Sequence, residues 1–100
     1  MKKEFFTLTG TNFYYGSSFL KPGMHVVLKK EPDNKYDKEA IEVRFEGLGK
    51  IGYVANSPNT VIGESMSAGR LYDRIGDNAE ARVVVITPEG VVCKITKRVR

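Results

Sequence analysis

Hydrophobic and polar residues alternate most regularly over residues 41–46, which read Ile-Glu-Val-Arg-Phe-Glu. A period of two places Ile41, Val43 and Phe45 on one face of a strand and the charged residues on the other. We therefore predict a strand with one face buried and one face in water. Nearby glycines predict a turn into a second strand over residues 50–54, so that the two strands form a hairpin.

Four other segments are rich in β-branched, aliphatic or aromatic residues and predict further strands. The segment over residues 24–31 ends at Pro32, because a proline cannot donate a hydrogen bond to a sheet. The segments over residues 80–86 and 91–97 are joined by Thr-Pro-Glu-Gly at 87–90, which predicts a turn and a second hairpin. The four segments cover residues 5–9, 24–31, 80–86 and 91–97.

A short helix is predicted after the first hairpin. Ser57 and Pro58 are the residue types of a helix N-cap and of the first helical position. Apolar residues recur at helical spacing within 61–66, and Gly69 is typical of a C-terminal cap. The polar, glycine-containing segment 71–78 is expected to form a loop or a marginal helical turn.

Five to six short strands with one or two short helices predict a mainly β fold, a small antiparallel β-barrel of the OB-like class. The chain has 100 residues, which suits a single domain spanning 1–100. No internal repeat or linker divides it. The fold class alone does not define a function.

Charge and composition limit the function classes. The formal net charge is +4, which permits a polyanionic partner without requiring one. Basic residues gather in the last seven positions, of which 97–100 are expected to form a frayed tail, although a solvated charged face gives the same pattern. No apolar stretch approaches the ~20 residues of a membrane span, and Cys93 is the single cysteine. We expect a soluble, cytoplasmic protein without a disulfide.

Motifs for cofactors, metals and catalysis are weak. Residues 47–52 match G-x-G-x-x-G, but a strand is predicted to follow where a dinucleotide site needs a helix. In the acidic loop, Lys35 and Lys38 occupy positions at which a calcium loop needs an oxygen ligand and a glycine. No residue pair has the spacing of an acid/base team. We therefore predict no enzyme, no cofactor and no metal.

Aromatic residues offer a different chemistry. Phe13, Tyr14 and Tyr15 are consecutive in a glycine-flanked loop, where alternation cannot bury all three, so at least one should be exposed. Exposed rings beside lysines suit single-stranded nucleic acid, because every base has a face that can stack. Alternatively, these rings plug the end of a small barrel. Periodicity does not decide between the two.

Three stretches together resemble the HIRAN domain family: LTGTNFYYG, then KPGMHVVLKKEPDNKYDKEAIEV, then GKIGYVANS. The similarity covers about residues 6–95, and EP-x-N-x-YD-x-x-AI is its most specific part. Members occur as amino-terminal modules of Swi/Snf-class DNA-repair translocases and as free-standing bacterial proteins. The resemblance implies an OB-like barrel that binds the 3′-hydroxyl end of single-stranded DNA, with a DNA-processing helicase or nuclease as a protein partner.

The resemblance also implies roles for particular residues. Tyr36 would be a stacking surface, and Asp37 would accept the hydrogen of the 3′-hydroxyl. A carboxylate repels phosphate, so it would select a hydroxyl end. Phe13 falls where the family's aromatic packs on a terminal base. The DNA-binding set implied is Asn12, Phe13, Tyr14, Asn34, Tyr36, Asp37, Lys38, Tyr53 and Asn56.

The chain departs from the family pattern at three of these positions. Asn12 stands where DNA-binding members carry Arg, Asn56 stands where they carry Lys, and Phe13 lacks the hydroxyl of the usual Tyr. A protein-interaction adaptor that kept the barrel and lost the DNA contacts is therefore the alternative function. For Asn34 and Asp37 the alternative role is to shape the loop by bonding backbone amides.

Overall fold

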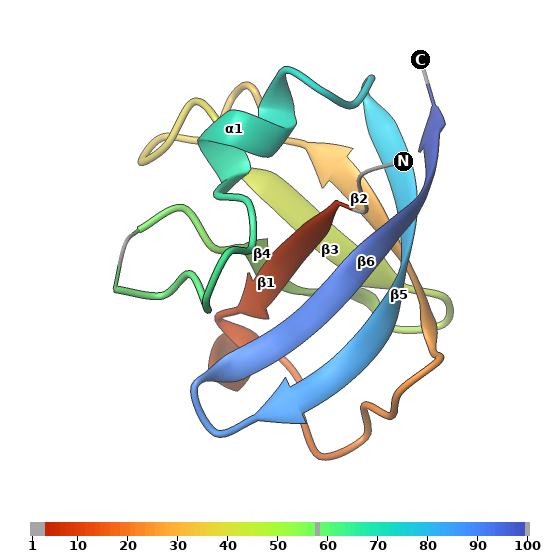
Figure 1. The fold of residues 1–100 in the computed structure, drawn as a ribbon. Helices are drawn as coiled ribbons and strands as arrows, with labels where there is room; N and C mark the ends of the chain where they lie inside the picture. The colour runs from red at the N-terminus through yellow and green to blue at the C-terminus, as the bar shows by residue number, and fades with distance from the viewer. Residues whose placement is uncertain (1–3, 58, 100) are drawn as a thin grey trace.

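Six antiparallel strands close into a barrel in the computed structural model, which describes residues 4–57 and 59–99 (Figure 1). Around the barrel the order is β1-β4-β3-β2-β5-β6, and β6 pairs with β1 to close it. The mainly β barrel predicted from the sequence is confirmed. The strands are β1 (Phe5–Thr9), β2 (His25–Lys30), β3 (Ile41–Phe45), β4 (Gly49–Val54), β5 (Asn78–Thr87) and β6 (Gly90–Val99).

Both predicted hairpins are present. β3 turns into β4 through Gly47 and Gly49, whose φ angles of 90° and 78° lie in the region that favours glycine. β5 turns into β6 at a pair formed by Thr87 and Gly90. The Thr87 hydroxyl donates to the Gly90 carbonyl at 2.8 Å and accepts from the Gly90 N–H at 3.1 Å. Local turn chemistry therefore sets both connections.

The barrel interior is filled by apolar side chains from every strand, and Ile41 and Val43 are fully buried as predicted. The expectation that the other face of β3 lies in water is wrong at Glu42, which is 6% exposed. Arg44 and Lys50 lie 3.1 and 3.8 Å from its carboxylate. A carboxylate can remain at a covered position because these cations compensate it.

The predicted helix lies in the wrong place. Residues 59–66 form turns and irregular structure, and the helix α1 spans Ala68–Tyr72, with Gly69 inside it. The Met66 N–H donates to the Phe5 carbonyl at 2.7 Å, so β1 holds this segment extended. Ser67 is the observed N-cap, and Pro58 lies outside the described residues. The segment 71–78, expected to form a loop or a marginal helical turn, begins with the last two residues of α1 and ends with the first residue of β5.

The carboxyl-terminal residues 97 and 98 do not form the frayed tail expected of them, because β6 includes them. Arg98 bonds the carboxylate of Glu4, which is buried beside β1. Pairing with a neighbouring strand and an ion pair to the buried Glu4 carboxylate therefore hold this segment, while Arg100 lies outside the described residues. None of the helices in the described ranges is long and apolar enough to cross a membrane.

Candidate nucleic-acid interface

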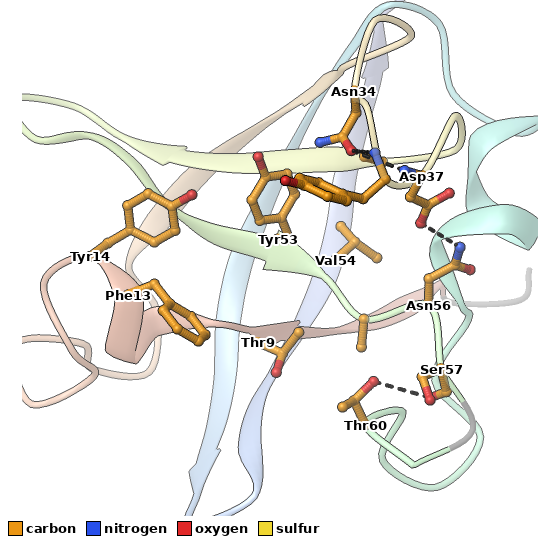
Figure 2. Close-up of a pocket in the computed structure, with 13 residues that line it drawn as sticks. Thr9, Phe13, Tyr14, Asn34, Asp37, Tyr53, Val54, Asn56, Ser57 and Thr60 are labelled. Atoms are coloured by element: carbon orange, nitrogen blue, oxygen red, sulfur yellow. Dashed lines mark hydrogen bonds between the residues drawn. The ribbon is translucent and has the colours of Figure 1, made fainter.

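An open hollow of about 820 Å³ lies where the end of β4 meets the loop after β1 and the loop after β2 (Figure 2). We call it the aromatic hollow. Figure 2 shows Phe13 and Tyr14 on one side, Asp37 and Asn56 on the other, and Tyr53 between them. Its lining residues are Thr9, Phe13, Tyr14, Asn34, Tyr36, Asp37, Ala40, Tyr53, Val54, Ala55, Asn56, Ser57 and Thr60.

The loop after β2 is shaped by Asn34. Its side-chain oxygen accepts from the N–H groups of Tyr36 and Asp37, at 2.9 and 3.0 Å. Its amide nitrogen donates to Glu31 at 3.0 Å. The turn leaves Tyr36 96% exposed at the edge of the hollow. Asn34 therefore shapes the loop, which was the alternative role predicted for it beside DNA binding, and it also lines the hollow.

Asp37 combines a structural contact with an open position. One carboxylate oxygen accepts from the Glu39 N–H and the other from the side-chain amide of Asn56, both at 2.9 Å. The residue is half-buried and lines the hollow. A carboxylate can accept about four hydrogen bonds, so two bonds leave it capacity for a ligand donor.

Asn56 connects this loop to α1. Its amide nitrogen donates to Asp37, and its side-chain oxygen accepts from the Gly69 N–H at 2.8 Å. Asn56 lines the hollow, but its polar atoms already have partners in the protein. It therefore positions Asp37.

The aromatic side chains present ring surface to solvent. Phe13 is 87% exposed, and it ends the short 3₁₀ helix η1 (Thr11–Phe13). Tyr14 packs at a tilt on Tyr53, with ring centroids 6.4 Å apart. The expectation that at least one residue of the aromatic run is exposed is confirmed. Phe13 does not plug the barrel.

Tyr53 is held from behind by charged residues. Its hydroxyl donates to Glu31 at 2.9 Å, and the Lys50 ammonium lies 2.8 Å from the same hydroxyl and 2.7 Å from Glu31. The Lys50 charge is therefore used inside the protein, beneath the ring that forms the floor of the hollow.

These contacts shift three pKa values. Burial by itself raises the pKa of Glu31, but hydrogen bonds from Lys50, Asn34 and Tyr53 outweigh it and hold the pKa below 4.5. Burial would lower the pKa of Lys50, and the contact with Glu31 instead raises it. The pKa of Tyr53 is raised by burial and by its bond to Glu31. At neutral pH the network is one ion pair with a neutral phenol.

Seven of the nine residues implied by the resemblance line the hollow, whereas Asn12 and Lys38 are exposed outside it. Asp37 is its one charged lining residue among those described, and no Lys or Arg lines it there. Ser57 and Thr60, which carry hydroxyl groups, also line the hollow. The sequence did not indicate them as site residues, because it predicted a helix for their segment. Nor does any group of three or more His, Cys, Asp or Glu in the described ranges form a metal site.

A small antiparallel barrel with exposed rings around an open hollow is typical of proteins that bind single-stranded nucleic acid. Comparison with known proteins agrees, because the family model of the HIRAN domain matches residues 3–99. The chain belongs to the HIRAN domain family. The HIRAN domain is a nucleic-acid-binding module.

A solved structure shows the same fold. It is the crystal structure of a protein from Lactobacillus plantarum, a structural-genomics target, with a TM-score of 0.63 and 23% sequence identity. The match covers 92% of this chain and 88% of that chain. The search of curated proteins found no match.

Proposed function

We propose that this chain is a non-catalytic module that binds single-stranded DNA at a 3′-hydroxyl end. One observation carries the proposal: Asp37 lies in the same open hollow as the exposed rings of Phe13 and Tyr36. Rings suit unstacked bases of any sequence, at roughly 1 to 3 kcal/mol per base. A carboxylate among them suits a hydroxyl donor and repels a phosphate.

The arrangement gives each group a separate task. The terminal base stacks on Tyr36 or Phe13, and the 3′-hydroxyl donates to Asp37. The bonds from Glu39 and Asn56 hold the carboxylate before the ligand arrives, which reduces the ordering cost of binding. A 3′-phosphate or an internal linkage at this position would place two negative charges together, so the site selects ends rather than sequences.

The test is fluorescence anisotropy with two oligonucleotides that differ only in a 3′-hydroxyl or a 3′-phosphate. We expect the wild type to prefer the hydroxyl end, by about tenfold or more, since a hydrogen bond to a charged group contributes roughly 1.5 to 3 kcal/mol. Asp37→Asn should lose most of this preference, because the amide no longer repels phosphate.

Asp33→Asn is the matched control, because Asp33 is an exposed carboxylate in the same loop that does not line the aromatic hollow. It removes the same charge and should keep the preference. Equal binding of the two oligonucleotides by the wild type, or an unchanged preference in Asp37→Asn, would contradict the proposal.

A protein-interaction adaptor is the second candidate. It is favoured by the lack of a basic lining residue in the described part of the aromatic hollow, together with Asn12 and Asn56 at positions where DNA-binding members carry basic residues. An adaptor should pass through DNA-cellulose at low salt. A DNA-binding module with about three phosphate contacts should be retained, with a logarithmic salt slope near −2.

A further inference from the structure

A second hollow, of about 520 Å³, contains three arginines and no aromatic residue among its described lining residues. We call it the arginine hollow. It lies beside α1, and its walls come from the segment before α1, from α1 itself and from β6. The lining residues are Glu4, Gly63, Glu64, Ser65, Met66, Arg70, Arg74 and Arg98.

Glu4 orients two of the three guanidinium groups. Its side chain is 9% exposed, and its two oxygens accept from Arg98 and from Arg74, the latter at 3.5 Å. Glu4 neutralises one positive charge. Each guanidinium has five N–H donors, so both arginines keep donors that Glu4 does not use.

Arg70 supplies the third guanidinium. It is exposed on α1, and no carboxylate of the described residues lies within 4.0 Å of its charged group. The Ser67 hydroxyl accepts from the Arg70 N–H at 3.3 Å and so begins the helix that carries it. Glu64 is the other acidic residue in the lining, and three arginines against Glu4 and Glu64 leave one net positive charge.

The two hollows lie along one stretch of chain. Ser57 and Thr60 line the aromatic hollow, and residues 63–66 line the arginine hollow. A hydrogen bond also connects Asn56, which lines the aromatic hollow, to α1, because its side-chain oxygen accepts from the N–H of Gly69, the residue before Arg70. One segment of chain thus contributes to a hollow with rings and a carboxylate and to a hollow with guanidinium groups.

We infer that the arginine hollow binds a backbone phosphate of the strand whose 3′ end occupies the aromatic hollow. The inference rests on the proposed function and extends it. Affinity for nucleic acid comes largely from neutralised phosphates, and the described lining of the aromatic hollow has no cation to neutralise one. Guanidinium groups match phosphate oxygens in charge and in geometry. The strand therefore has its end and its backbone recognised at separate places.

The experiment compares Arg70→Gln with the wild type on thymidine oligonucleotides of two and of ten nucleotides, both with a 3′-hydroxyl. The decamer should bind roughly tenfold more weakly to the variant at low salt, because a charge-assisted hydrogen bond is lost. Its salt slope should fall by about 0.7, the value for one phosphate on a single strand. The dinucleotide has a single internucleotide phosphate, next to the 3′ end in the aromatic hollow, and we expect it to bind equally to both proteins.

Two variants serve as controls. Lys21→Gln removes one positive charge from an exposed turn before β2, far from α1 in Figure 1, and should leave the salt slope unchanged. Glu64→Gln removes a repelling carboxylate from the arginine hollow and should tighten decamer binding by about twofold at low salt. A gain in affinity cannot result from unfolding, so this variant separates a direct role from damage to the fold.

The outcomes distinguish this inference from the proposed function. A wild type that prefers the 3′-hydroxyl, with Arg70→Gln unchanged on the decamer, would overturn the inference alone. An equal loss on both oligonucleotides, or the same loss in Lys21→Gln, would also overturn it. If the wild type bound neither oligonucleotide, both the inference and the proposed function would fall.

Discussion

At the residue scale, the position of Asp37 depends on one partner from its own loop and one from a distant part of the chain. The Glu39 N–H lies in its own loop, and Asn56 lies beyond β4 and is itself bonded to α1. A carboxylate held in this way loses little side-chain freedom when a ligand binds. Asn56 therefore acts on the site as a positioning amide.

Glu31 is the residue whose protonation should matter most for stability. It bonds Lys50, Tyr53 and Asn34, and its folded-state pKa lies below the ordinary 4.5. A lowered carboxyl pKa stabilises the fold above the unfolded value and ceases to do so as pH falls through the folded value. Glu31→Gln should therefore lower the free energy of unfolding by about 2 kcal/mol at pH 7. The loss should shrink at pH 3.

Urea unfolding followed by circular dichroism at the two pH values measures this. Glu46→Gln is the control, because Glu46 is an exposed carboxylate in the turn between β3 and β4. It should change stability little at either pH. If Glu31→Gln lowered the free energy of unfolding equally at pH 3 and pH 7, packing rather than ionisation would explain the effect.

At the element scale, β4 carries the floor of the aromatic hollow and must approach β1 closely to close the barrel. Gly52 allows this approach. A β-carbon there would lie 2.6 Å from the Thr9 carbonyl oxygen and 2.7 Å from a methyl carbon of Leu8. The glycines of the G-x-G-x-x-G match therefore serve a hairpin turn and a strand contact. As predicted, a strand follows them where a dinucleotide site needs a helix.

Gly52→Ala should lower the free energy of unfolding by about 3 kcal/mol, because the backbone of β1 must move to admit the methyl group. Gly69→Ala is the matched comparison. A β-carbon at Gly69 would lie 2.7 Å from a carboxylate oxygen of Glu39, which is the end of a flexible side chain and can move away, and alanine favours a helix by roughly 0.8 to 1 kcal/mol. Thermal and urea unfolding should therefore separate the two. Equal destabilisation by both substitutions would contradict the close-approach argument.

At the scale of the whole molecule, closure of the barrel determines which groups solvent can reach. Cys93 on β6 pairs with Phe6 of β1 and with Val83 of β5, so it lies at the seam where the chain's two ends meet. Its side chain is fully buried, and burial raises the pKa of the thiol to about 12. Both effects suppress the thiolate, which is the reactive form.

Cys93 should therefore react with a thiol reagent at pH 8 only when the barrel opens. The labelling rate should follow global unfolding, and one thiol per chain should react at once in concentrated urea. Stopped-flow labelling across urea concentrations measures this. Fast labelling in native buffer, at a rate independent of urea, would show that β1 and β6 separate locally without unfolding of the rest.

The family resemblance implied seven residues of the aromatic hollow, whereas the local sequence pattern alone determined the strands and both hairpins. These features depend on neighbours within a few positions: a period of two buries Ile41 and Val43, and Gly47 with Gly49 makes a turn. An aromatic run that cannot all be buried must expose a ring, and Phe13 does so.

Only the tertiary structure decided the start of α1, the burial of Glu42 and the assembly of the arginine hollow. Each depends on partners far apart in sequence. Met66 is extended because it bonds Phe5, and Glu4 meets Arg98 only because β6 closes the barrel against β1. Local propensity is a small free energy per residue, and such distant contacts override it. The sequence lists the groups at the site, and the closed barrel determines which of them can act together.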